Sequence, residues 1–113
     1  MDQKIKLIIS FVIPWLLFVA ASIPLILNKI PPNGLYGFRT AKTLIKTEYW
    51  YKANRFGGLC LFISAVIALT GLILLFINKD RITFDLMNTI GFSLFAGPIT
   101  VSIILTILYI EKL

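Results

Sequence analysis

Charged residues are scarce in this sequence, and histidine is missing altogether. Only 14% of the 113 residues are Asp, Glu, Lys or Arg, whereas a soluble domain carries about a quarter. The single cysteine excludes an intramolecular disulfide, and the lack of histidine excludes His-ligated metals and most Ser-His or Cys-His nucleophile systems. We therefore expect an integral membrane protein rather than a water-soluble globular domain.

Three long apolar runs contain no charged residue, at 7–27, 56–77 and 86–110. Each is as long as the roughly 20 residues that span the hydrocarbon core of a bilayer. The runs are apolar on every face, and only helices satisfy the backbone of such segments in lipid. We therefore predict an all-α membrane protein with three transmembrane helices at these positions. It forms a single domain over 1–113, with one long structured loop at 28–55 and a turn at 78–85.

The first run has an alternative interpretation as a signal peptide. Lys4 and Lys6 precede it, and Val19-Ala20-Ala21 resembles a cleavage site. However, the run stays apolar for several residues past Ala21, longer than the usual apolar region of about 7–15 residues. We therefore expect a membrane-spanning helix here.

The distribution of Lys and Arg predicts an orientation. Four of the 11 basic residues belong to the N-terminus and the turn: Lys4, Lys6, Lys79 and Arg81. The other seven belong to the long loop and the C-terminus: Lys29, Arg39, Lys42, Lys46, Lys52, Arg55 and Lys112. Because basic loops stay in the cytoplasm, we predict a cytoplasmic loop and an N-terminus outside.

The three spans contain no ionisable side chain of the Asp, Glu, Lys, Arg or His type. Proton relays and ion-coupled transport normally need such a group inside the bundle, which argues against a pump acting as a single chain. Small residues recur four apart, as in Ser64 and Ala68 or Ser93 and Gly97. This spacing favours close helix packing within the bundle, and a homo-oligomer stays open.

No catalytic constellation is found. The acids Asp2, Glu48, Asp80, Asp85 and Glu111 are scattered over both sides of the membrane, without paired carboxylates or metal-ligand spacing. We therefore expect no catalytic residue, no metal site and no cofactor, and we do not expect an enzyme. The positive charge is explained by membrane orientation, so no nucleic-acid partner is expected.

Helix boundaries can be predicted from local signals. Pro31-Pro32 ends the first helix. Thr43 or Thr47 is suited to cap a further helix that has Glu48 in its first turn and continues into the second span. Asp85 is a plausible N-cap of the third helix.

The C-terminal part of the loop combines aromatic and polar side chains. Trp50 and Asn54 lie four residues apart and so share a helical face. We expect Trp50 to anchor the loop at the membrane interface, where aromatic rings are common. We expect Asn54 and Arg55 to form hydrogen bonds to the loop and fix its fold.

Arg39 is the strongest candidate for recognition. It lies in Gly37-Phe38-Arg39-Thr40, close to the turn signal Asn33-Gly34. A guanidinium beside a hydroxyl and backbone amides suits a phosphate or a carboxylate. The alternative is that Arg39 is one more orienting charge that contacts anionic lipid.

The same stretch carries a family resemblance. The segment 32–40 is followed by Thr43-Leu44, Glu48, Trp50, Lys52, Asn54-Arg55 and Gly57-Gly58, and together they resemble the SdpI family. These are small bacterial membrane proteins named for an immunity factor against a secreted killing-factor peptide. Two departures are Ala41, where the family often has proline, and the length, which is similar to that of single-module members.

The resemblance implies a protein of the bacterial cytoplasmic membrane that protects it from a toxin peptide and signals by sequestering a regulatory protein. The binding residues expected in the loop are Asn33, Gly37, Arg39, Thr40, Trp50, Asn54 and Arg55. Their expected partners are membrane lipids, a toxin peptide or a regulatory protein. Two other functions stay open: an oligomeric transporter or permeability subunit lined by hydroxyls, and an accessory protein that binds lipid headgroups through Arg39.

Overall fold

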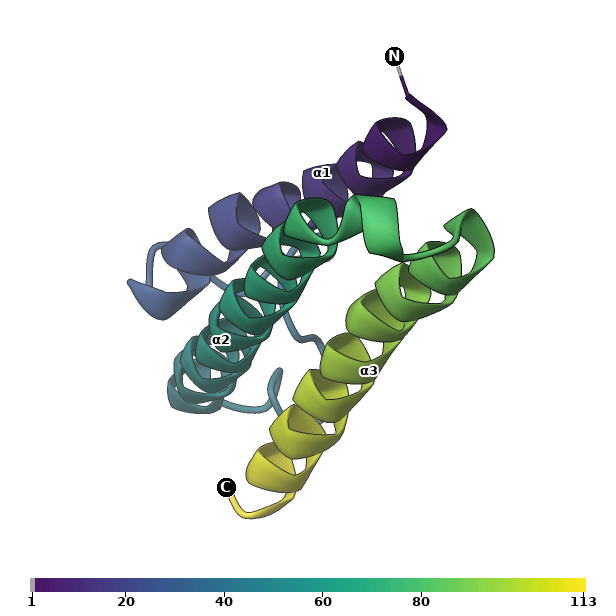
Figure 1. Ribbon diagram of the computed structural model, residues 1–113. Helices are drawn as coiled ribbons and strands as arrows, with labels where there is room; N and C mark the ends of the chain where they lie inside the picture. The colour runs from purple at the N-terminus through teal and green to yellow at the C-terminus, as the bar shows by residue number, and fades with distance from the viewer. Residues whose placement is uncertain (1) are drawn as a thin grey trace.

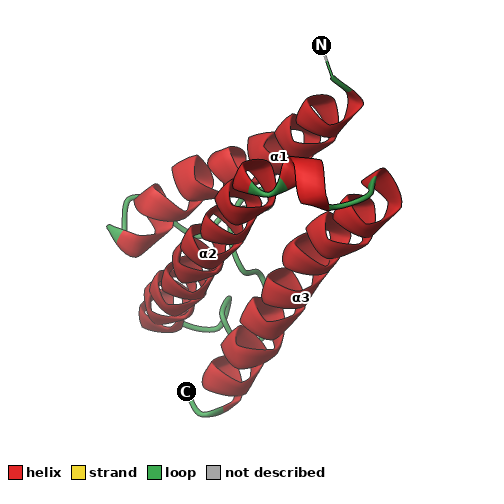
Figure 2. Cartoon of the chain, viewed as in Figure 1, coloured by secondary structure: helices red, strands yellow, loops and turns green. Residues whose placement is uncertain are grey.

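The computed structural model describes residues 2–113 and contains three long helices (Figures 1 and 2). Helix α1 spans Gln3–Ile26, α2 spans Thr47–Ile77 and α3 spans Phe84–Glu111, with a short 3-10 helix η1 at Lys79–Arg81 between the last two. Within residues 2–113 there is no strand. All three long helices are long and apolar enough to cross a membrane, so the predicted fold class is confirmed.

Helix α2 begins well before its apolar run, as predicted. It starts at Thr47 with Glu48 in its first turn and continues without a break through Ile77. The predicted threonine cap is wrong, because Lys46 is the N-cap residue and makes no side-chain cap. Thr47 is already helical, and the Thr43 hydroxyl bonds to the backbone of the loop.

The other two helix ends also differ from the prediction in detail. Helix α1 ends at Ile26, before the prolines, where Asn28 adopts a left-handed conformation with φ of 57°. A left-handed residue just past a helix is a common way to end it. Helix α3 is capped by Thr83, whose hydroxyl accepts a hydrogen bond from the Leu86 amide at 3.2 Å. Asp85 lies in the first turn and is not the cap, so that prediction is wrong.

The core of the bundle surrounds Trp15 of α1. Its fully buried ring packs against the buried α2 residues Ala65 and Ala68, whose small side chains leave room for it. The edges of Phe18 and Phe95 approach it at ring-centroid distances of 5.6 and 5.8 Å. The outer faces of the helices expose many large aliphatic side chains, as expected for a surface that contacts lipid.

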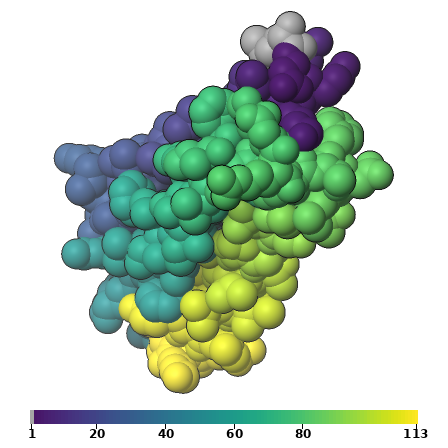
Figure 3. Space-filling view, viewed as in Figure 1, coloured from purple at the N-terminus to yellow at the C-terminus, as the bar shows by residue number. Residues whose placement is uncertain are grey.

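The connecting segments lie at two opposite ends of the bundle, in the same two groups in which the Lys and Arg residues were counted. At one end the Lys4 amine donates to the Lys79 carbonyl at 2.7 Å, so the N-terminus lies beside the turn. At the other end the Lys42 amine donates to the Glu111 carbonyl at 2.9 Å, which places the long loop beside the C-terminus. The ribbon and space-filling views show the N- and C-terminal segments at these opposite ends (Figures 1 and 3).

Candidate functional site

The long loop folds back onto the first turns of α2, and Trp50 lies at the centre of this contact. Its side chain is completely buried, and its ring nitrogen donates a hydrogen bond to the Ile30 carbonyl at 2.8 Å. The expectation that Trp50 anchors the loop is therefore confirmed, and the ring does so through contacts inside the protein. Trp50 holds the loop from the inside, because indole offers a large apolar surface and one donor that needs a partner when buried.

Asn54 joins the loop to α2 one turn further along the helix. Its side-chain oxygen accepts a short hydrogen bond from the Phe38 amide. Its side-chain nitrogen donates to the Trp50 carbonyl at 2.9 Å and to the Phe38 carbonyl at 3.4 Å. Asn54 thus makes the loop contact expected of it. Arg55 is exposed and makes no hydrogen bond or ion pair within residues 2–113.

Asn33 organises the turn at the start of the loop. Its side-chain oxygen accepts from the amides of Leu35 and Tyr36 at 2.8 and 2.7 Å. Its side-chain nitrogen donates to the carbonyls of Pro31 and Tyr36 at 2.8 and 2.9 Å. Because one side chain serves four backbone groups, Asn33 has a structural role in the turn, as asparagine commonly has.

Gly37 occupies a position that no other residue fits without strain. Its φ is +117°, and a Cβ atom placed there would lie 2.7 Å from the Asn54 oxygen and 3.0 Å from the Trp50 ring. Gly57 on α2 plays the complementary role, since a Cβ atom there would overlap the Phe38 ring. Glycine at both positions lets the loop backbone and the Phe38 ring lie directly on the helix.

Thr40 and Thr43 close a second turn by bonding to each other. The Thr40 amide donates to the Thr43 hydroxyl at 2.8 Å, and the Thr43 amide donates to the Thr40 hydroxyl at 3.2 Å. Thr43 is fully buried. The hydroxyl and amide of Thr40 are therefore engaged within the loop, and Thr40 holds the turn beside Arg39.

Arg39 is exposed between these two fixed residues. Phe38 is held by Asn54 and Thr40 is held by Thr43, so the backbone on both sides of Arg39 is fixed. Within the described chain the Arg39 guanidinium has no hydrogen-bond or ion-pair partner. A cation presented in this way can bind a phosphate or carboxylate without first breaking an internal contact.

Sequence reasoning missed Tyr36, whose hydroxyl donates a short hydrogen bond to the Ala21 carbonyl of α1. Burial raises the pKa of the Tyr36 hydroxyl, which further favours the protonated form that donates this bond. A tyrosine in an interfacial loop usually indicates contact with lipid headgroups, so its type alone gives no signal of this bond.

Glu48 and Lys52 form an ion pair on the exposed side of α2, with 2.7 Å between the amine and a carboxylate oxygen. Their hydrogen bond lowers the pKa of Glu48 and raises the pKa of Lys52. Such exposed pairs contribute little to stability.

In residues 2–113 there is no group of three His, Cys, Asp or Glu side chains that could hold a metal. Arg39 and Arg55 are the exposed arginines of this end of the molecule, and they have no hydrogen-bond or ion-pair partner within the described part of the chain.

Comparison with known proteins gives one match. The model of the SdpI/YfhL protein family matches residues 29–110, from the start of the long loop almost to the end of α3. The match includes Asn33, Arg39, Trp50 and Asn54. No curated protein and no solved structure matches the chain.

Proposed function

The chain belongs to the SdpI/YfhL protein family, and from this we propose a non-catalytic protein of the bacterial cytoplasmic membrane that protects this membrane from a secreted toxin peptide. The three apolar helices make it a membrane protein of that family. The protective role is what the family resemblance implies for such a chain. We further propose that the long loop recognises an anionic group on a lipid, the peptide or a regulatory protein.

The observation that carries this proposal is the exposure of Arg39 on a loop whose backbone is held on both sides. The orientation of a membrane protein depends on the number of basic residues in its loops and not on whether a loop is folded. Orientation alone therefore does not explain why this loop has a fixed conformation. A fixed turn that presents one guanidinium is typical of recognition, because less conformational freedom is lost when the ligand binds.

The signalling part of the proposal rests on charge. Residues 28–55 contain six basic residues and one acid, Glu48, which gives the loop a net charge of +5. A basic surface at the cytoplasmic face attracts an acidic region of a regulatory protein by electrostatic complementarity. Capture of the regulator would then depend on ionic strength, because exposed charges are screened by salt.

Deletion of the gene in its own bacterium tests the protective role. We expect the deletion strain to grow poorly in stationary-phase culture supernatant of the parent strain, and plasmid-borne wild-type protein to restore growth. Equal growth of parent and deletion strain in that supernatant would contradict the proposal.

Arg39 variants in the same assay test the proposed recognition point. Lysine keeps the charge but loses the planar fork of the guanidinium. We therefore expect Arg39→Lys to restore growth nearly as poorly as Arg39→Ala, at equal membrane levels. Arg81→Ala, at the opposite end of the bundle, is the control and should restore growth fully. If lysine substitutes completely, Arg39 contributes charge only; if both variants protect, recognition lies elsewhere.

A further inference from the structure

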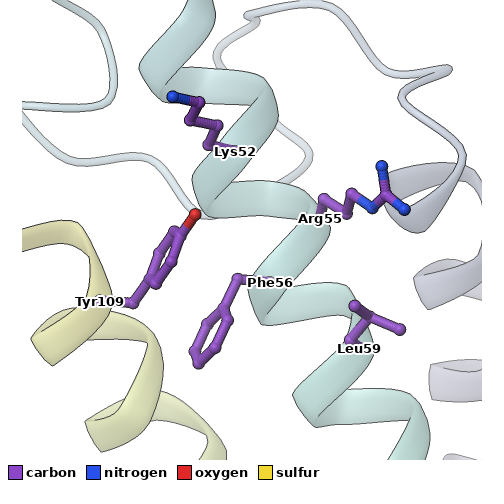
Figure 4. A pocket seen from close by; sticks show the side chains of 5 residues that line it. All are labelled: Lys52, Arg55, Phe56, Leu59 and Tyr109. Carbon is purple, nitrogen blue, oxygen red and sulfur yellow. The ribbon is translucent and has the colours of Figure 1, made fainter.

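A groove opens on the outer face of α2, beside its contact with α3, at the end of the bundle that carries the loop (Figure 4). It has a volume of about 210 Å³ and is lined by Lys52, Arg55, Phe56 and Leu59 of α2 and by Tyr109 of α3 (Figure 4). Sites that enclose a whole small molecule usually measure about 300–1,000 Å³. A ligand of this groove would therefore lie partly in it and partly along the exposed helices.

The groove lies where the hydrocarbon core begins. Lys52 and Arg55 are the last charged residues before the charge-free run at 56–77, and Tyr109 lies next to the end of the run at 86–110. Charged residues and tyrosine at the ends of spans mark the level of the lipid headgroups. The cationic side chains thus lie among the headgroups, and Phe56 and Leu59 lie at the upper edge of the acyl chains.

The lower part of the groove is apolar. The rings of Phe56 and Tyr109 stack with their centroids 4.3 Å apart and their planes within 5°. Leu59 is 40% exposed beside them. Arg55 and Leu59 are four residues apart and so follow one another along the same helical face, as Figure 4 shows. This face places a cation directly above an apolar wall.

Arg55 is the cation that is free to bind. It has no ion-pair or hydrogen-bond partner in residues 2–113, whereas Lys52 is paired with Glu48. A guanidinium binds a phosphate with two parallel hydrogen bonds. Because Glu48 balances the charge of Lys52, Arg55 is the unbalanced charge of the groove; it repels the ammonium group of a zwitterionic headgroup and favours a lipid with net negative charge.

We propose that this groove binds an anionic phospholipid, with its phosphate on Arg55 and one acyl chain along Leu59 and Phe56. The lipid covers the outer face of α2 beside the stacked rings of Phe56 and Tyr109, where the groove is open (Figure 4). The site is separate from Arg39 and does not depend on the protective role proposed above, because it rests on the groove alone.

The test uses the full chain, delipidated in a non-ionic detergent. Phosphatidylglycerol and phosphatidylcholine with identical acyl chains are titrated separately, and bound lipid is counted by native mass spectrometry. We expect phosphatidylglycerol to bind more tightly than phosphatidylcholine. Arg55→Ala should weaken phosphatidylglycerol binding by about tenfold or more, as for the loss of a hydrogen-bonded charged contact. Leu59→Trp, which fills the groove and keeps the cations, should weaken it as well.

Two controls separate this site from general attraction to a basic surface. Lys6→Ala and Arg81→Ala remove one cation from the opposite end of the bundle and should leave the affinity for phosphatidylglycerol unchanged. Equal affinity for the two lipids, unchanged binding by Arg55→Ala and Leu59→Trp, or equal weakening by the control variants would each overturn the proposal. A shift in thermal stability produced by inorganic phosphate as large as that produced by phosphatidylglycerol would also overturn it, since the acyl chain would then contribute nothing.

Discussion

In the loop between α1 and α2, a few side chains supply the hydrogen-bond partners that backbone groups supply in helices. Backbone amides and carbonyls that leave water need partners, and residues 28–46 form no helix or strand. Asn33, Thr43 and Asn54 supply these partners from their side chains. Each bonds to more than one backbone group, so the loop has a fixed conformation without secondary structure.

Gly37 is the residue at which this conformation can be tested most sharply. Alanine at this position would be strained at φ +117° and would press against Asn54 and Trp50. We expect Gly37→Ala to lower the free energy of unfolding by about 1–3 kcal/mol. Gly34→Ala is a matched control in the same loop, because a Cβ atom there meets nothing within 4 Å. Thermal melts in detergent compare the two, and equal melting of Gly37→Ala and Gly34→Ala would show that the loop is not fixed as described.

Helix α2 is long enough both to span the membrane and to extend beyond it, where it contacts the loop. Its 31 residues extend about 46 Å at 1.5 Å per residue, against a hydrocarbon core of about 30 Å. The part that exceeds the core is the amino-terminal segment that carries Trp50 and Asn54. Further along, two buried serines join α2 to α3, with 2.6 Å between the hydroxyl oxygens of Ser64 and Ser102.

This serine pair gives a prediction for helix packing. The two hydroxyls also lie within hydrogen-bond distance of backbone carbonyls of the facing helices, at Pro98 and Cys60, so one of their protons is shared. A double-mutant cycle with Ser64→Ala and Ser102→Ala should give a coupling free energy of about 0.6 kcal/mol, and up to about 1.7 kcal/mol, as for other hydroxyl contacts between membrane helices.

The control for the cycle is Ser93, which is exposed and bonds to the Thr89 carbonyl of its own helix. Ser93→Ala should not couple to Ser64→Ala when unfolding is followed in detergent. Additive losses for Ser64 and Ser102 would mean that the pair does not hold α2 to α3.

The elements could be predicted from the sequence, whereas most contacts of the site could not. Long charge-free runs leave helices as the only solution in a bilayer, so three spans follow from composition alone. The loop contacts depend on which residues meet in space. The spacing of Trp50 and Asn54 predicts a shared face, but nothing local indicates that the Tyr36 hydroxyl reaches α1 or that Thr43 pairs with Thr40. Likewise the cap of α3 could be Thr83 or Asp85 by residue type, and only the helix start decides between them.

For the molecule as a whole, the bundle divides its connecting segments between two ends. The loop and the C-terminus share one end, and the N-terminus and η1 share the other. The seven-to-four division of Lys and Arg between these ends predicts that the loop end faces the cytoplasm.

Cysteine labelling tests this orientation. In a Cys60→Ser background, single cysteines are placed at Lys42 and at Asp80, which lie at opposite ends. In intact cells an impermeant maleimide should label the Asp80 position and not the Lys42 position. Both positions should be labelled after permeabilisation, which shows that both thiols are reactive. Labelling of the Lys42 position alone in intact cells would mean that the orientation is inverted.

The bonds of the loop to α1 and α2 also bear on how the chain is made. Trp50 bonds to Ile30, and the Tyr36 hydroxyl bonds to α1, so the loop is held by segments on both sides of it in the chain. Helix α3 bonds to the loop at its last residue, where the Glu111 carbonyl accepts a hydrogen bond from the Lys42 amine. During synthesis, the first two helices and the loop can therefore assemble as one unit in the membrane before the ribosome has released α3. Helix α3 then packs against this preassembled unit.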